Sequence, residues 1–299
     1  MSFRAPSINY PFSDEPVDLT ETILDVSSEG IATLAMNRPE IKNAMTRRLA
    51  FEVAQLLVAL DQDDDVRGVV LTGTGEAFCS GAYLKGGNLH EGGNYSHHES
   101  LHRHYPIPNQ TRAVRTEPIG WWGPMVKTIF NYSKPIVAAV GGPAFGGGFG
   151  LACACDFRIV SDRGSFASIF IKRGFGPEVG TTFHLPRIVG FQKALELVMT
   201  GRTVNSEEAL ALGLADRVVP HESLQEAATD FMRELTVDKP LVALAVTRKI
   251  MYQSLEVNNL TAQLGMENGA GEITSNAPED RAESFKSFVE KRPGKYVGQ

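Results

Sequence analysis

The residues best placed to do chemistry in this sequence are three consecutive glycines, Gly146 to Gly148, which stand between two apolar stretches. A strand-like run from Pro135 to Val140 precedes them. The small apolar run from Phe149 to Ala154 follows and is typical of a helix buried against a sheet. Glycine lets the backbone approach a ligand closely, and the first amides of a helix have no partner within it. We therefore expect this turn to present N–H groups and a positive dipole end to developing negative charge.

A second turn of small residues follows another expected strand. Residues 68–72 read Gly-Val-Val-Leu-Thr, and residues 77–85 read Ala-Phe-Cys-Ser-Gly-Ala-Tyr-Leu-Lys. A hairpin is expected over residues 22–26 and 31–36. Between hairpin and strand, a helix is predicted by an apolar stripe at helical spacing, formed by Leu49, Val53, Leu56, Leu57 and Leu60. Strand, helix and strand in this order predict parallel strands joined by a crossover.

A third glycine-rich turn, over residues 172–180, carries Glu178 directly before a helix expected over residues 181–189, which contains His184. Ser223 begins a capping box for a later helix that runs to about residue 235. Further helices are expected over residues 190–200, 206–212, 241–250 and 279–291. Strands dominate early and helices late, so three parts are expected: an irregular arm (1–20), a β/α core (21–200) and a helical C-terminal region (201–299).

Residues 86–122 show no periodicity, and they are rich in histidine, with Trp121 and Trp122 near the end. A loop of this length inside a compact domain is usually a lid, a binding loop or disordered. No cysteine or carboxylate pair stands at a ligand spacing typical of zinc, so a solvated lid is favoured over a metal site. The histidines concerned are His90, His97, His98, His102 and His104.

The composition argues against several classes of protein. A net charge of -6 disfavours a dedicated nucleic-acid surface, and no apolar run approaches the roughly 18 residues of a membrane span. The cysteines, Cys79, Cys153 and Cys155, are odd in number and lie in apolar surroundings, so buried thiols in a reducing compartment are expected. The N-terminus carries no apolar signal segment. We expect a cytoplasmic protein with no nucleic-acid or membrane partner.

Four segments in order resemble the crotonase superfamily, the enoyl-CoA hydratase and isomerase enzymes. They are MNRPEIKNAM (36–45), LTGTGEAFCSGAYLK (71–85), KPIVAAVGGPAFGGGFGLACACD (134–156) and GRTVNSEEALALGLADRVV (201–219). The resemblance covers nearly all of the chain from about residue 21 to 291. It implies an α/β fold, a crotonase-like spiral of ββα units with a C-terminal α-helical trimerisation region. It also implies an acyl-CoA thioester substrate and a homotrimer or a dimer of trimers.

The resemblance implies a chemistry that fits the two glycine-containing turns. In this family two backbone amides hold a thioester carbonyl and stabilise an enolate, and the matching positions are Ala82 and Gly147. Such a donor is worth on the order of 10²–10³ in rate. Coenzyme A is then part of the substrate, and no separate cofactor is expected. The residues expected to line its cleft are Asn43, Ala44, Ala82, Tyr83, Leu84, Lys85 and Gly147, and Lys291 is a candidate for a CoA phosphate.

The sequence departs from the best-known hydratases, which use two glutamates. Their positions match Gly150 and Phe170, so both acids are missing. A third acidic position, used in the dienoyl-CoA isomerase branch and in some hydratase-like proteins, matches Glu178. We expect Glu178 to be the catalytic acid/base, in an apolar pocket that raises its pKa, and the alternative is a surface carboxylate that only begins a helix. Tyr83 also replaces a common aspartate, with little consequence expected because the backbone does the binding.

The residues leave the exact reaction open. A single carboxylate can move a proton between two carbons, which is isomerisation. It can also activate a water molecule and then return a proton to the substrate, which is hydration. His184 could assist, although a helix-face histidine packed in the core is the favoured interpretation. A thioester or C–C bond hydrolase of the same fold and a non-catalytic acyl-CoA binder remain as alternatives. Trp121 and Trp122 suggest a bulky or aromatic acyl pocket.

Overall fold

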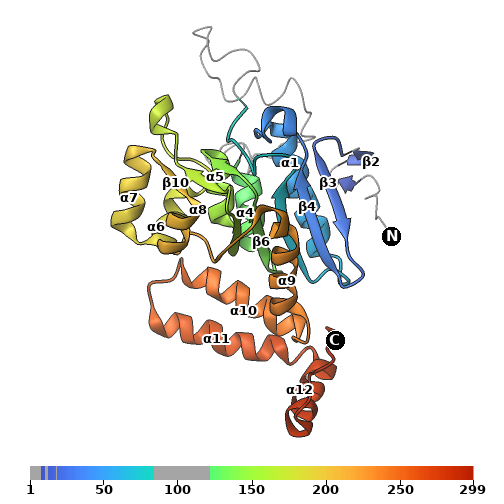
Figure 1. The fold of residues 1–299 in the computed structure, drawn as a ribbon. Coiled ribbons are helices and arrows are strands. Elements are labelled where there is room, and N and C mark those ends of the chain that lie inside the picture. Colours follow the sequence, from blue (N-terminus) through green and yellow to red (C-terminus); the bar gives the residue numbers. More distant parts are fainter. Residues whose placement is uncertain (1–7, 11–12, 18, 84–121, 299) are drawn as a thin grey trace.

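The computed structural model describes residues 8–10, 13–17, 19–83 and 122–298. These residues form a twisted sheet flanked by helices, followed by a helical extension that projects from one end (Figure 1). Leu84, Lys85 and the histidine-rich stretch up to Trp121 lie outside the described residues.

The main sheet has six strands in the order β11-β8-β6-β5-β4-β3. β3 and β4 form an antiparallel hairpin, and every other neighbouring pair is parallel. The apolar runs expected to be buried strands form β5 and β6 at its centre, which agrees with the crossover expected from the strand–helix–strand order. The strands are β3 Thr22–Val26, β4 Ile31–Met36, β5 Gly68–Gly73, β6 Ile136–Val140, β8 Phe157–Ser161 and β11 Arg217–Val219.

A smaller three-stranded sheet, in the order β10-β9-β7, is formed by strands that follow β6 in the sequence. Its strands are β7 Pro143–Phe145, β9 Ser165–Ala167 and β10 Thr203–Asn205. The N-terminal arm expected to be irregular contains an antiparallel ribbon of β1 Ile8–Tyr10 and β2 Ser13–Val17. Strand pairing also extends past residue 200, because β10 pairs with β9 in the smaller sheet and β11 pairs with β8 in the main sheet. The boundary expected at residue 200 therefore falls within the sheet-forming part of the chain.

Helices cover both faces of the main sheet. Alternate residues of β6 point to opposite faces, as the two-residue period of a strand requires. Val137 and Ala139 pack with Met232 of α9 on one face, while Ile136 and Ala138 belong to the core on the other. The helices of the core are α1 Arg47–Asp61, α4 Gly123–Asn131, α5 Gly147–Ala154, α6 Thr181–Val189, α7 Phe191–Thr200, α8 Ser206–Ala211 and α9 Leu224–Thr236. Short 3₁₀ turns are η1 Pro39–Ile41, η2 Ile171–Arg173 and η3 His221–Ser223.

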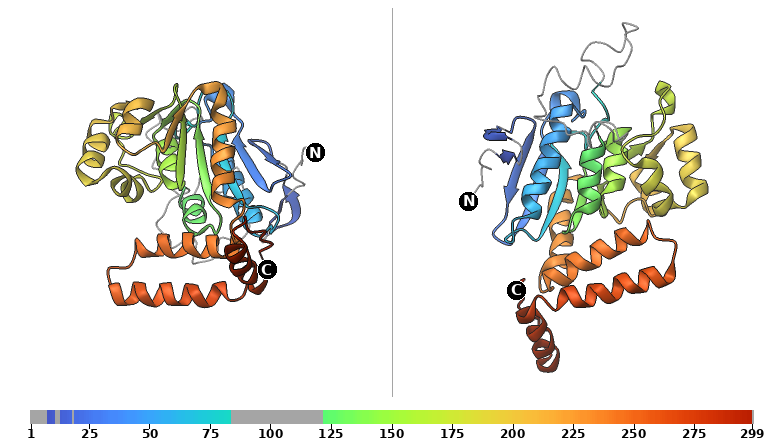
Figure 2. Two further views of the ribbon diagram at one scale, coloured as in Figure 1. Left: turned by 60° about the horizontal axis from the view of Figure 1, so that its bottom comes forward. Right: turned by 180° about the vertical axis from the view of Figure 1, so that it is seen from behind.

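The C-terminal extension consists of α10 Leu241–Ser254, α11 Leu260–Thr274 and α12 Pro278–Glu290. α10 and α11 form an antiparallel pair, and α12 projects beyond them (Figure 2). Buried Arg248 of α10 fastens this extension to the core, because its guanidinium binds Asp156 at 2.9 Å and the Ile129 carbonyl at the end of α4 at 2.9 Å. In the described ranges, no helix has the length and apolarity that a bilayer crossing requires.

Most of the expected elements are confirmed, with differences that have physical causes. α5 begins at Gly147, two residues before the apolar run that predicted it. The α9 helix forms, but the Ser223 side chain makes no capping bond, because Ser223 already has helical φ and ψ angles. The sequence did not predict α11, whose apolar side chains Leu260 and Leu264 are exposed rather than packed in the core.

Candidate functional site

The two glycine-containing turns lie side by side because backbone hydrogen bonds join them. The Cys79 amide donates to the Pro143 carbonyl at 3.1 Å, and the Phe145 amide donates to the Cys79 carbonyl at 2.9 Å. On the other side, the Met45 amide donates to the Gly81 carbonyl at 2.7 Å, and the Tyr83 amide donates to the Met45 carbonyl at 3.0 Å. The turn from Cys79 to Tyr83 is thus held between the loop before α1 and the start of α5.

The Ala82 and Gly147 amides are brought close together by this pairing. A Cβ built on Gly81 would lie 2.9 Å from the Phe145 carbonyl oxygen and 3.4 Å from the Gly147 amide nitrogen. Gly81 also has a φ of 99°, so only glycine fits this close approach without strain. Gly147 is the first residue of α5, where an amide has no acceptor within the helix. The described residues likewise provide no acceptor for the Ala82 amide, since Met45 binds the groups on either side of it.

The Asn43 side chain is buried and supports the turn through hydrogen bonds within the protein. Its side-chain amide donates to the carbonyls of Thr74 and Ala77, both at 2.8 Å, and its side-chain oxygen accepts from the Arg38 amide at 2.8 Å. Asn43 is 0% exposed, and its φ of 51° places it in the left-handed region, which asparagine tolerates. These bonds tie the loop before α1 to the end of β5.

The residues expected to line the substrate cleft therefore divide into two groups. Asn43 and Ala44 are buried, so this loop can face a ligand only through its backbone, while the Asn43 side chain positions the turn. Tyr83 is 38% exposed and directly follows the Ala82 amide, so it can face a ligand. Leu84 and Lys85 lie outside the described residues.

Acidic residues of related enzymes match three positions of this chain, of which only Glu178 is acidic here, and the three positions have different surroundings. Gly150 is buried inside α5, and Phe170 is half-buried just before η2. Glu178 lies on the loop between η2 and α6, and its side chain is exposed, so the expected burial in an apolar pocket is not found. The Glu178 backbone is nevertheless fixed, because its carbonyl accepts from the Thr181 amide at 3.1 Å and from the Thr181 hydroxyl at 2.6 Å.

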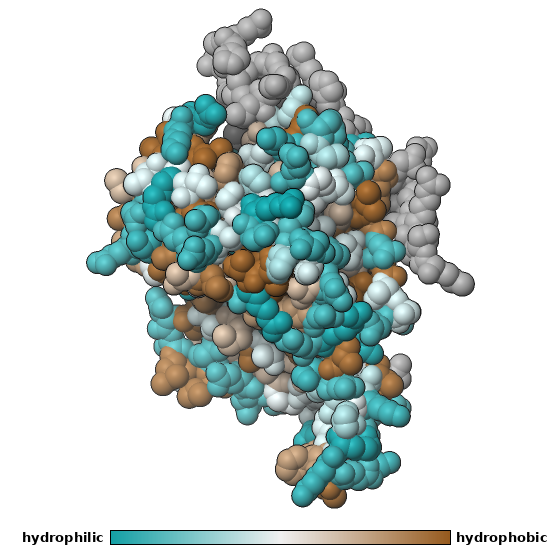
Figure 3. Space-filling model, in the orientation of Figure 1, coloured by the Kyte–Doolittle hydropathy of each residue, from teal (hydrophilic) through white to brown (hydrophobic). Residues whose placement is uncertain are grey.

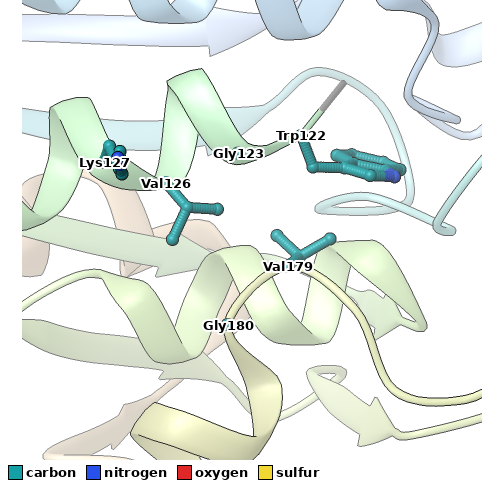
Figure 4. A pocket seen from close by; sticks show the side chains of 6 residues that line it. All are labelled: Trp122, Gly123, Val126, Lys127, Val179 and Gly180. Atoms are coloured by element: carbon teal, nitrogen blue, oxygen red, sulfur yellow. The ribbon is translucent and has the colours of Figure 1, made fainter. Parts of the chain in front are cut away.

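A cavity of about 260 Å³ lies beside these elements, between the start of α4 and the turn that precedes α6. Trp122, Val126 and Val179 line this space; in Figure 4 Val126 and Val179 point toward it, and the Trp122 ring extends away from Val126, above Val179. The Trp122 ring lies against Gly147, since a Cβ built on that glycine would be 2.9 Å from a ring carbon. One apolar wall of the cavity is thus in contact with one of the two paired amides.

His184 and the cysteines are part of the core, as the sequence predicted. His184 is 6% exposed, and burial, aided by the nearby positive charge of Arg187, lowers its pKa to about 4. Burial raises the pKa of each of the three cysteine thiols to about 12, and all three are free and buried. Across residues 19–83 and 122–298, no cluster of histidine, cysteine and carboxylate side chains could hold a metal ion.

Lys291, the candidate for a CoA phosphate, lies directly after α12 at the lower end of Figure 1. The start of α5 lies in the upper half of the molecule, and the further views keep the two apart (Figure 2). Within one chain, Lys291 is therefore not brought to the paired amides.

Two features of the site were not expected from the sequence. The first is the contact between Trp122 and Gly147, because the sequence suggested that Trp122 helps to form an acyl pocket but indicated no partner for it. The second is Val179, which has a φ of 57° and packs against Gly150. The glycine at position 150 was the available signal, since a helix-interior glycine in a packed region often marks a close backbone approach.

The fold and the paired amides define a class of α/β enzymes, and comparison with known proteins identifies the family. The family model described as enoyl-CoA hydratase/isomerase matches residues 26–119 and 120–299. The chain belongs to this family, which confirms the resemblance seen in the sequence.

Known relatives match most of the chain. A 1,2-epoxyphenylacetyl-CoA isomerase of Escherichia coli is 29% identical, over 94% of this chain and 100% of the relative. A probable enoyl-CoA hydratase of Mycobacterium bovis is 34% identical, over 81% of this chain and 80% of the relative. The crystal structure of an enoyl-CoA hydratase from Bacillus anthracis superposes with a TM-score of 0.80 at 28% identity, and covers 94% of this chain and 100% of that one.

Proposed function

We propose that this enzyme of the hydratase/isomerase type binds an acyl-CoA thioester with its carbonyl oxygen between the Ala82 and Gly147 amides, which act as an oxyanion hole. The observation that carries the proposal is the pairing of the two turns, which leaves these two amides adjacent and without acceptors among the described residues. Negative charge that develops on the thioester oxygen is stabilised by both donors and by the start of α5.

Glu178 is the acid/base of this site. Its turn packs on α5, because Val179 contacts Gly150, one helical turn after Gly147. An exposed carboxylate on a fixed backbone can take a proton from a carbon next to the thioester and return it, a contribution typically worth about 10²–10⁴ in rate. The relatives that are named hydratase and isomerase support either hydration or double-bond isomerisation as the outcome.

The acyl group occupies the cavity lined by Trp122, Val126 and Val179. The cavity is bounded by Trp122, whose ring contacts Gly147, and by Val179, the residue after Glu178, so an acyl chain inside it would lie near both parts of the proposed site. The apolar side chains of Trp122, Val126 and Val179 support a compact apolar group here, such as a ring or a branched chain. Tyr83, which is exposed directly after the Ala82 amide, contributes to binding of the coenzyme A portion, and Leu84 and Lys85 stay predictions from the sequence.

The protein acts as a homotrimer or a dimer of trimers built through its C-terminal helices. Apolar side chains on the surface of these helices support this assembly, and the brown atoms over α11 and α12 in Figure 3 show part of that surface. Lys291 would then serve a neighbouring subunit rather than its own. The exposed apolar residues of α10, α11 and α12, together with Leu255 directly after α10, are Met251, Leu255, Leu260, Leu264, Ile273, Phe285, Phe288 and Val289.

Product analysis with a panel of unsaturated acyl-CoA thioesters tests the proposed function. The wild-type protein is expected to shift the double bond or add water, and Glu178→Gln is expected to lose this turnover by roughly 10²-fold or more. Glu222→Gln is the matched control, since Glu222 is an exposed carboxylate in a short turn directly before α9. Release of free thiol would favour the hydrolase alternative, and binding without turnover of any thioester would favour a non-catalytic binder.

A further inference from the structure

Position 150 has no room for any side chain. A Cβ built on Gly150 would lie 2.7 Å from the Thr181 hydroxyl oxygen, 2.8 Å from the Val179 Cβ and 2.9 Å from the Val179 carbonyl oxygen. Real Cβ atoms are almost never found this close to backbone or to another Cβ. Gly150 follows Gly147 by one helical turn, so the volume beside the paired amides on this face of α5 belongs to the turn that carries Glu178.

Val179 fills this volume in a conformation that valine rarely adopts. It has a φ of 57°, in the left-handed region, where a β-branched residue is an outlier. It is 5% exposed, with its side chain directed into the cavity opposite Trp122 (Figure 4). Strained residues of this kind persist only where the surroundings hold them, and they cluster at functional sites.

The surroundings hold this turn from two sides. The Thr181 amide and hydroxyl both bind the Glu178 carbonyl, at 3.1 Å and 2.6 Å, which closes the turn around Val179. Gly180 follows with a φ of 68° and leads directly into α6. The position of Glu178 relative to α5 is therefore set by the contact of Val179 with Gly150.

We propose that Val179 is a positioning residue that commits the site to one-carboxylate proton transfer, that is, to double-bond isomerisation rather than addition of water. It holds Glu178 beside the paired amides and excludes a second acid or an ordered water from the space next to Gly150. The inference rests on the proposed function, because it requires Glu178 to be the acid/base.

The proton transfer balances without a co-reactant. The Glu178 carboxylate takes a proton from a carbon of the acyl chain, so a C–H bond breaks, an O–H bond forms and the electron pair moves to the thioester oxygen as an enolate. The protonated Glu178 then gives the same proton to another carbon of the chain. The enolate collapses, the double bond has shifted by one position, and the carboxylate is regenerated.

A double-mutant cycle tests the proposal through kcat, KM and the product ratio. Gly150→Ala adds the excluded Cβ and is expected to lower kcat by roughly 10²-fold with KM little changed, because small displacements of a catalytic group have effects of this size. The double variant, Gly150→Ala together with Val179→Gly, lacks the Val179 Cβ that collides with the added methyl group. Its kcat is expected to be about tenfold higher than that of Gly150→Ala alone. Gly176→Ala is the control, since a Cβ built there meets nothing within 4 Å.

Val179→Gly alone keeps the test informative if Gly150→Ala fails to fold. This variant opens the space beside Gly150, so its ratio of hydrated to isomerised product is expected to rise above that of the wild type. A wild-type protein that yields mainly the hydrated product would overturn the proposal, as would Gly150→Ala with unchanged kcat. If the wild type turns over no thioester, or Glu178→Gln stays fully active, it is the proposed function that fails.

Discussion

His184 should make the stability of this protein fall as the pH drops below 6.5. The imidazole is buried on α6, directly behind the Val179 turn: a Cβ built on Gly180 would lie 3.0 Å from its ring. Burial first, and then the positive charges of Arg187 and Arg158, lower its pKa from 6.5 to about 4. The folded protein therefore holds this histidine neutral at pH values where the unfolded chain binds a proton.

The sign and size of the effect follow from linkage. The folded-state pKa lies below the unfolded-state value, so the stabilisation is fully present above pH 6.5 and is lost as the pH falls toward 4. A shift of this size corresponds to about 3 kcal/mol in the free energy of unfolding once the pH is below both values. At pH 5 the loss is about 2 kcal/mol, a substantial part of the stability of a typical domain.

Urea unfolding at pH 7.5 and pH 5, followed by circular dichroism, measures this difference. The His184→Leu variant cannot bind the proton, so its free energy of unfolding should fall by about 2 kcal/mol less than that of the wild type between the two pH values. The difference between the two pH values is taken within each protein, so a pH-independent change in stability caused by altered packing cancels. Equal pH dependence in the two proteins would refute the assignment of a neutral buried His184.

Three substitutions test the scaffold of the site. Arg248→Met leaves the Asp156 carboxylate, whose side chain is only 9% exposed, without its cationic partner, so the free energy of unfolding should fall by about 3–5 kcal/mol; a loss below about 1 kcal/mol in urea unfolding would contradict the structure. Asn43→Ala removes the side chain that holds the end of β5, and kcat should fall more than KM changes; a normal kcat in a folded variant would show that the turn needs no such support. Trp122→Leu removes an apolar wall of the cavity and should raise KM for aromatic thioesters more than for short linear ones; equal changes would place the acyl group elsewhere.

Strands and helices with strong periodicity could be predicted from the sequence because their patterns match their environments. The residues of β6 form an unbroken apolar run, which is the signature of a strand buried on both faces. The stripe of α1 from Leu49 to Leu60 lies in the core as predicted. α11 gave no such signal, because its apolar side chains are exposed and do not form the core-facing stripe that sequence patterns reveal.

The backbone part of the site was easier to predict than its side chains. Glycine-rich turns such as the one before Gly147 indicate close backbone approach whatever the partner is. By contrast, the role of Asn43 depends on carbonyls more than 30 positions away in the chain, and no local pattern reveals such a contact. The left-handed conformation of Val179 was equally hidden, because valine is among the least expected residues there and only tertiary contacts hold it.

The most direct test of the account is hydrogen exchange at the carbon next to the thioester. A saturated acyl-CoA incubated with the protein in D₂O can neither isomerise nor gain water, so exchange followed by NMR reports only enolate formation. The wild-type protein is expected to introduce deuterium at this carbon, Glu178→Gln to lose that activity, and Glu222→Gln to retain it. Exchange by Glu178→Gln at the wild-type rate would contradict the assignment of Glu178 as the base that works with the Ala82 and Gly147 amides.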